Sequence, residues 1–136
     1  MANINRVSQY EKLYRVIKRS KPDCITLSGK VSPALFKDAN GVSVDRDCGR
    51  TEAQVIDFII NVTFVQRAKA IGEIDSSFCF DIGADVVPAP SDIDPFHANI
   101  WLDSESEEIR NIQALKLADN CNIVYRNDNI DWTVSL

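Results

Sequence analysis

Residues 36–54, FKDANGVSVDRDCGRTEAQ, hold three local structure signals in one short stretch. An Asn-Gly pair at residues 40–41 can adopt positive φ angles and close a turn. Val42 and Val44 then alternate with polar residues, which is typical of a strand with one buried face. Residues 51–54, TEAQ, have the spacing of a capping box and predict the start of a helix. The stretch therefore indicates a turn, a strand and a helix start.

The same stretch also carries acids and a cysteine, so metal binding and nucleophilic catalysis are alternatives. A calcium loop of the EF-hand type requires Gly at its sixth position and Glu at its twelfth. The register from Asp38 puts Ser43 at the sixth position, and the register from Asp45 puts Ile56 at the twelfth. Cys48 precedes a predicted helix start and has arginines nearby, which can lower the pKa of a thiol. We interpret it as an ordinary loop thiol.

Length and composition indicate one globular domain over residues 1–136. The chain has 45% hydrophobic and 26% charged residues, and folding at this length removes about two-thirds of the unfolded surface from water. It contains no apolar segment long enough for a signal peptide or a membrane span, and its four cysteines form no CxxC pair. We therefore expect a cytoplasmic protein with reduced thiols. A single histidine and scattered cysteines predict no metal site, and no motif indicates a cofactor.

Two segments permit more than one structure. Ser8 begins a capping box, and apolar residues follow it at helical spacing, yet the letters LYRVIKR from Leu13 favour a strand. The sequence leaves open whether Leu13 to Lys18 is helix or strand. Residues 61–72 could likewise continue the helix that begins near Thr51 or insert a strand at residues 62–65.

The remaining patterns define the predicted fold class. Alternating or β-branched segments predict further strands over residues 78–82, 96–102, 122–126 and 130–134, with a hairpin between the last two. A capping box at Ser104 predicts a helix through about Ala118, with Ile109, Ile112 and Leu115 facing the core. Together these elements predict an α+β domain: a mixed, largely antiparallel sheet packed by two or three helices.

Charge is unevenly distributed along the chain. Residues 1–37 hold eight of the 15 bases and two of the 20 acids, so residues 38–136 hold seven bases and 18 acids. Such a basic segment can contact phosphate or an acidic protein, and we expect Lys18, Arg19 and Lys21 to form the partner contact. The net charge of −5 makes nucleic acid a less favoured partner.

His97 is the only histidine, and alternation places it on the same strand face as Asn99 and Trp101. Imidazole on a polar face can carry a proton or bind a ligand. The alternative is a partly buried histidine bonded to the backbone. A catalytic dyad with Cys48 is a further possibility, because catalytic partners are often distant in sequence.

Two short motifs resemble the ADP-ribosyltransferase-like folds. LYRV places Arg15 in an early apolar segment, and GVSVDR places Ser43 on a central strand. The resemblance implies that Arg15 holds the phosphates of NAD and that Ser43 orders the nicotinamide pocket. The chain has no clear counterpart of that family's later catalytic glutamate.

A broader pattern resembles a group of small bacterial proteins without an assigned activity. It comprises Arg15, Pro22, Phe36, Gly41 to Val44, Pro95 to Ala98, and Leu117-Ala118. This resemblance implies a compact domain from a bacterium or phage.

Three functions follow from the sequence. The first is a cytoplasmic binding or accessory domain that recognises a protein partner through its basic segment. The second is an ADP-ribosyltransferase-like enzyme, or another protein that binds NAD or phosphate, with Arg15, Ser43 and His97 as its catalytic residues. The third is a nucleic-acid-binding module. The enzyme requires these three side chains to meet in one pocket, whereas the binding domain does not.

Overall fold

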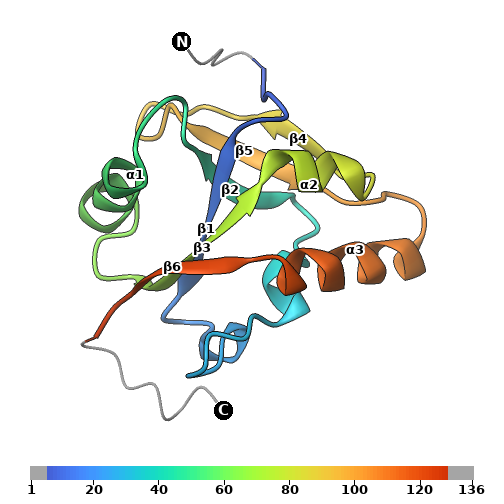
Figure 1. Cartoon of the computed structure of the whole chain (residues 1–136), viewed down its shortest axis with the longest axis horizontal. Coiled ribbons are helices and arrows are strands. Elements are labelled where there is room, and N and C mark those ends of the chain that lie inside the picture. The colour runs from blue at the N-terminus through green and yellow to red at the C-terminus, as the bar shows by residue number, and fades with distance from the viewer. Residues whose placement is uncertain (1–5, 129–136) are drawn as a thin grey trace.

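The computed structural model describes residues 6–128 and contains six strands around which the helices are arranged (Figure 1). The strands are β1 (Lys12–Lys18), β2 (Val42–Arg46), β3 (Ala68–Asp75), β4 (Asp85–Pro88), β5 (His97–Trp101) and β6 (Asn122–Arg126). The α-helices are α1 (Glu52–Phe58), α2 (Ser76–Asp81) and α3 (Glu107–Asp119). Short helices are the 3-10 turns η1 (Pro22–Cys24) and η2 (Pro33–Phe36), and the π-helix η3 (Ile59–Thr63).

The strands form one sheet in the order β4-β5-β2-β1-β3-β6, and each of the five pairings is antiparallel. The predicted α+β class is therefore confirmed. The predicted strand at residues 130–134 and its hairpin lie outside the described residues. No helix between residues 6 and 128 combines the length and apolar character that crossing a membrane requires.

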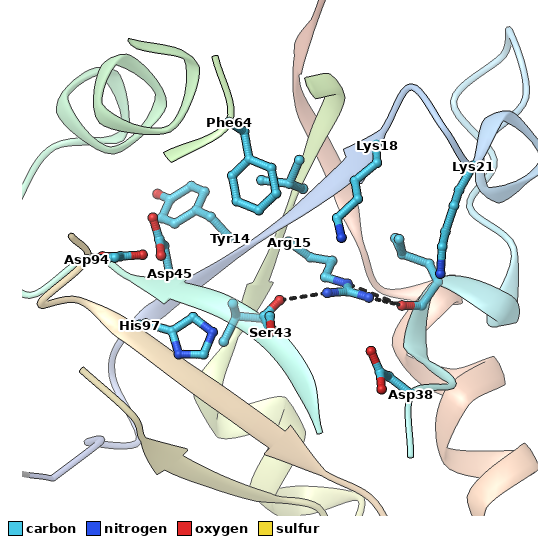
Figure 2. A pocket seen from close by; sticks show the side chains of 13 residues that line it. Tyr14, Arg15, Lys18, Lys21, Asp38, Ser43, Asp45, Phe64, Asp94 and His97 are labelled. Carbon is cyan, nitrogen blue, oxygen red and sulfur yellow. Dashed lines mark hydrogen bonds between the residues drawn. The ribbon is translucent and has the colours of Figure 1, made fainter. Parts of the chain in front are cut away.

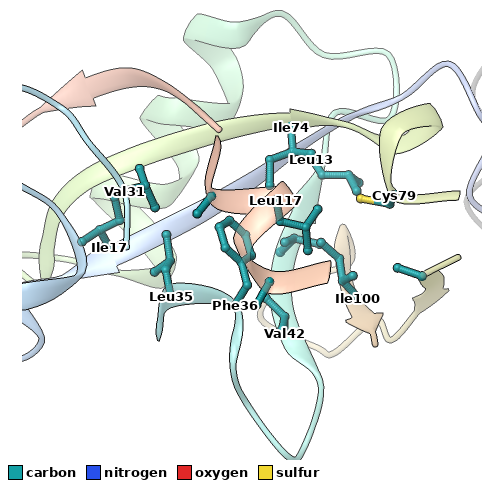
Figure 3. Packing of buried hydrophobic residues seen from close by; sticks show 14 of the residues in the cluster. Leu13, Ile17, Val31, Leu35, Phe36, Val42, Ile74, Cys79, Ile100 and Leu117 are labelled. Atoms are coloured by element: carbon teal, nitrogen blue, oxygen red, sulfur yellow. The ribbon is translucent and has the colours of Figure 1, made fainter. Parts of the chain in front are cut away.

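Helices cover both faces of the sheet (Figure 1). On one face α2, α3 and η2 pack over the larger core, which is centred on Leu13, Phe36 and Leu117 (Figure 3). On the other face α1 and η3 bury Val55 and Ile59 against β1 and β3. A central strand that is covered on both faces reads as a nearly continuous apolar run.

That double covering explains why the sequence of β1 is ambiguous. Leu13 and Ile17 enter the larger core, while Tyr14 and Val16 enter the smaller one, so the strand shows no simple alternation. The Ser8 pattern makes local hydrogen bonds of the capping type, including one from the Ser8 amide to Glu11 Oε2 at 2.6 Å, but no helix follows. The strand alternative is the correct one.

The helix start at Thr51 is confirmed, because the side chains of Thr51 and Gln54 each accept a hydrogen bond from the other's backbone amide. The helix continues through η3, and the following strand begins only at Ala68, so the alternative strand at residues 62–65 is wrong. Ser32 caps η2, as the Ser-Pro pair indicates, and Gly41 closes the next turn with a φ of 90°.

The predicted strand at residues 78–82 is wrong. Residues 76–81 form α2, which begins where β3 ends and buries Cys79 in the larger core while Phe80 stays partly exposed. The backbone amide of Ser76 donates to Glu11 O, and its hydroxyl donates to Ser8 O. These contacts hold Ser76 against the segment before β1 at the end of the ladder, and α2 begins there despite the strand propensity of the aromatic residues that follow.

The predicted buried stripe of α3 is also wrong. The helix begins after Ser106 rather than Ser104, and its buried face consists of Gln113, Ala114, Leu117 and Ala118. Ile109, Ile112 and Leu115 are instead 46%, 47% and 50% exposed. Two alanines let the helix approach η2 closely. Gln113 then connects two loops, since its amide oxygen accepts from Asp103 N at 2.8 Å and its nitrogen donates to Ile82 O at 3.1 Å.

A buried ion pair anchors the start of β1 to the end of β2. Arg46 is 1% exposed and Glu11 is 6% exposed, and the guanidinium binds both carboxylate oxygens at 2.8 and 2.9 Å. Arg46 Nη2 also donates to Arg6 O at 2.7 Å, which holds the N-terminal segment against the sheet. Hydrogen bonding to Glu11 raises the pKa of Arg46.

We expect Arg46→Met to lower the free energy of unfolding by about 3–5 kcal/mol, because it leaves the Glu11 carboxylate buried without its partner. The double variant Glu11→Leu/Arg46→Met should recover most of this loss, since it removes both charges. Urea unfolding of the two variants and the wild type measures the difference. A double variant less stable than Arg46→Met would contradict this account.

Candidate functional site

The candidate site is a cavity where β1 and β2 separate. The two strands are paired only at Leu13 with Arg46 and Tyr14 with Asp45. Beyond these two pairs β1 stays paired with β3 as far as Lys18, while β2 stays paired with β5 as far back as Val42. The gap between the diverging strands holds a cavity of about 150 Å³ (Figure 2).

Arg15 bridges this gap in place of a backbone ladder. Its Nε and Nη2 donate to Leu35 O at 3.2 and 2.9 Å, and its Nη1 donates to Ser43 O at 2.9 Å. These bonds use three of the five guanidinium N–H groups and leave one on each terminal nitrogen. Burial lowers the pKa of Arg15, although an arginine remains charged in a protein. No carboxylate within residues 6–128 forms an ion pair with it.

Ser43 and His97 line the same cavity as Arg15, so the structure brings the three predicted catalytic residues together. The Ser43 hydroxyl makes no hydrogen bond with the described residues. His97 Nδ1 lies 2.9 Å from Ala89 O, an acceptor, so the neutral ring carries its proton on Nδ1 and keeps a lone pair on Nε2. His97 therefore makes the backbone hydrogen bond that the alternative interpretation of this residue required. It also lines the cavity.

Two carboxyl groups that the sequence analysis missed complete this side of the cavity. Asp45 and Asp94 are 5% and 7% exposed, and Figure 2 shows their carboxyl groups next to each other. Burial, followed by hydrogen bonding and charge repulsion from Asp94, raises the pKa of Asp45 to about 8. Asp45 Oδ2 has no hydrogen-bond partner among the described residues. Asp94 Oδ1 is held by the amide of Phe96 at 3.0 Å.

The sequence contained a signal for one of these carboxyl groups. Asp45 lies two residues after Ser43 on the same strand, so alternation places both on one face. Asp45 also pairs across the sheet with His97. Asp94 lies in the proline-containing loop before β5, where no periodic pattern indicates which way a side chain points.

The three basic residues of the predicted partner contact lie in two different places. Lys18 and Lys21 line the cavity, and all three basic residues of the contact are exposed. Arg19 instead donates to Gln66 O at 3.1 Å, beside the turn before β3. The basic segment is thus partly an extension of the site around Arg15.

Cys48 lies outside this cavity, in the turn between β2 and α1. Burial raises the pKa of its thiol and outweighs the neighbouring arginines, which is consistent with an ordinary loop thiol. All four cysteines are free thiols. No group of three or more histidine, cysteine or acidic side chains suited to a metal ion occurs in the described part of the chain.

The fold and site define an antiparallel α+β domain with a small polar cavity in a divided sheet. No protein-family model, no curated protein and no solved structure matches the chain. The chemistry of the cavity is therefore derived from its own residues. Arg15 can hold an anionic group, and His97, Asp45 and Asp94 can accept or donate a proton beside it.

Asp45→Asn should change the dependence of stability on pH. The pKa of Asp45 is about 8 in the folded state and close to 3.9 in an unfolded chain, so the folded state binds the proton more tightly. This contribution to stability is present below pH 4 and is lost as the pH rises towards 8. Asparagine resembles the protonated carboxyl group. We expect the variant to be more stable than the wild type at pH 9, by at least about 1 kcal/mol, the equivalent of less than one pKa unit.

Thermal unfolding at pH 5, 7 and 9 measures this effect. Asp38→Asn is the matched control, because Asp38 also lines the cavity but is exposed. A difference between Asp45→Asn and wild type that stays constant from pH 5 to pH 9 would show that Asp45 is ionised in the folded protein.

Proposed function

We propose that this domain binds a small ligand through an anionic group that contacts Arg15 in the cavity between β1 and β2. The observation that carries the proposal is the half-buried guanidinium of Arg15, which has two unused N–H groups and no ion pair with a carboxylate of residues 6–128, although the charge of Asp38 acts on it from a longer distance. A buried charge is costly unless it is paired, and backbone carbonyls alone neutralise none of it. An anion that enters the cavity would supply the missing partner.

The distribution of charged side chains around the cavity indicates which chemical groups the ligand carries. Lys18 and Lys21 lie on the same side of the cavity as Arg15, where three cations outnumber the one acid, Asp38, whereas Asp45, Asp94 and His97 lie on the other side (Figure 2). The cationic side favours a phosphate or carboxylate. The opposite side favours a group that donates or exchanges a proton, because Asp45 is mainly protonated at pH 7 and His97 presents its Nε2 lone pair as an acceptor. Such a ligand has an anionic group next to a polar, proton-bearing group.

The size of the cavity sets the scale of the enclosed group. A volume of about 150 Å³ suits one phosphate, one small carboxylic acid or several water molecules, each of which occupies about 30 Å³ in the liquid. It is smaller than the roughly 300–1,000 Å³ of pockets that enclose drug-sized ligands. NAD, which the resemblance to ADP-ribosyltransferase-like folds implies, would place one phosphate or its nicotinamide here and extend past the exposed lysines. Arg15 and Ser43, on which that resemblance rests, line this cavity.

An enzymatic function follows if the proton carriers act on the bound ligand. His97 Nε2 would accept a proton from the ligand, and protonated Asp45 would donate one. The anionic group on Arg15 would fix the ligand's orientation during the transfer. Ser43 would bind or position the ligand through its free hydroxyl.

A protein partner is the second candidate, and the exposure of Lys18, Arg19 and Lys21 at one end of β1 favours it. An acidic segment of the partner would contact these side chains from outside the cavity. Charge reversal at all three positions should then abolish capture of the partner in a pull-down, and Arg15→Gln should leave capture unchanged. Capture that persists after charge reversal would exclude this surface.

We expect inorganic phosphate to bind in the cavity and to shift the backbone amide resonances of Ser43 and Val44 in nitrogen-15 NMR spectra. Arg15→Gln should abolish these shifts. Because Arg15 also holds the diverging strands, Lys18→Gln and Lys21→Gln provide variants with intact folds. Each should weaken binding about threefold, as expected for one partly exposed charge near an anion. Parallel titrations with NAD and with a short-chain carboxylate identify the preferred anion.

Lys30→Gln is the matched control, because Lys30 is equally exposed but does not line the cavity. It should bind phosphate as the wild type does. The proposal fails if neither phosphate, carboxylate nor NAD shifts these resonances at 10 mM, or if Lys30→Gln weakens binding as much as Lys18→Gln does.

A further inference from the structure

The outer face of α3 carries an apolar stripe that nothing in the described structure covers. Ile109, Ile112 and Leu115 are each about half exposed, at 46%, 47% and 50%, and they lie three residues apart. Residues at this spacing are neighbours on one side of a helix. The opposite side of α3 already packs against the larger core through Ala114 and Leu117. The helix is therefore apolar on two sides, and only one side is buried within the monomer.

The stripe is symmetric about its central residue. Ile109 and Leu115 lie three residues before and after Ile112. If a second α3 lies antiparallel across the first, with a twofold axis at Ile112, the two Ile112 side chains meet at the axis, and Ile109 and Leu115 of each copy lie on either side of it. A twofold interface of this kind uses the same surface of both copies, so the surface must be complementary to itself.

The charges beside the stripe have the same symmetry. Glu108 and Lys116 are exposed and lie four residues before and after Ile112, on the same side of the helix. Neither forms an ion pair with any residue in the range 6–128. In the antiparallel arrangement Glu108 of each copy faces Lys116 of the other. Opposite charges that flank an apolar seam set the partner and its direction in paired helices.

We propose that α3 is a self-association surface through which two copies of this chain pair antiparallel, with Ile112 at the twofold axis. The apolar contact comes from Ile109, Ile112 and Leu115, and two Glu108–Lys116 pairs set the direction. The helix has 13 residues and is about 20 Å long, so the interface falls below the roughly 1,200 Å² of a standard-size complex. The dimer is therefore in exchange with the monomer.

The surface is independent of the cavity between β1 and β2, since none of the residues that form it lines that cavity. Dimerisation leaves the cavity open, so ligand binding and self-association can be tested separately. Failure of one proposal does not affect the other.

Sedimentation equilibrium of the wild-type chain from 5 to 500 µM should show a reversible monomer–dimer transition. Ile112→Glu should remove it, because two carboxylates would then meet at the axis. Ile112 is half exposed, so circular dichroism should show an unchanged fold. A wild-type chain that stays monomeric at 500 µM overturns the proposal, whether the stripe binds another protein or nothing.

Charge exchange tests the antiparallel direction. Glu108→Lys and Lys116→Glu should each weaken self-association about tenfold, because each replaces two attractive pairs with two repulsive ones. The double variant Glu108→Lys/Lys116→Glu should associate as the wild type does. An equimolar mixture of the two single variants should form the mixed dimer, in which both pairs are again attractive.

Glu107→Lys is the matched control, because it makes the same charge change in the first turn of α3 but on a different side of the helix. It should associate like the wild type. A mixture of the single variants that associates no more strongly than either variant alone overturns the antiparallel pairing.

Discussion

The structure depends on the way Arg15 bridges two strands that begin as neighbours and then separate. After two residue pairs β1 leaves β2, and the guanidinium donates across the gap to Ser43 O on β2 and to Leu35 O on η2. Backbone carbonyls in a protein interior need a donor, so the split is stable only because a long cationic side chain reaches them. The Glu11–Arg46 pair closes the other end of the short ladder. The two arginines thus limit where the sheet can open.

The opening determines the chemistry of the cavity. Ser43 and Asp45 on β2 and His97 on β5 line the cavity beside this opening while their strands stay paired with each other. Arg15 cannot be discharged, whereas the neighbouring Asp45 escapes the cost of burial by keeping its proton. The result is a fixed positive charge beside groups that exchange protons. That combination favours an anionic ligand and permits acid–base chemistry on it.

Some elements of this fold were predictable because their signals are local. The capping box at Thr51 and the alternation of β2 and β5 depend on neighbours within a few residues, and each predicted its element correctly. The prediction of a strand at residues 78–82 is wrong because the ladder with β1 ends just before Ser76, whose partners lie more than 60 residues away in sequence, and no local pattern shows where that end falls. The prediction that the apolar stripe of α3 faces the core is wrong because periodicity identifies an apolar side of a helix but not what covers it.

The sequence by itself determined the α+β class, the helix start at Thr51 and the strands that carry Ser43 and His97, because propensity, capping and alternation act over short distances. It also singled out Arg15, Ser43 and His97 as candidate site residues. Only the tertiary structure decided that these three line one cavity, that Asp94 faces Asp45 and that α3 turns its large aliphatic side chains outward. Each of these depends on strand order and on the separation of β1 from β2, which long-range packing sets.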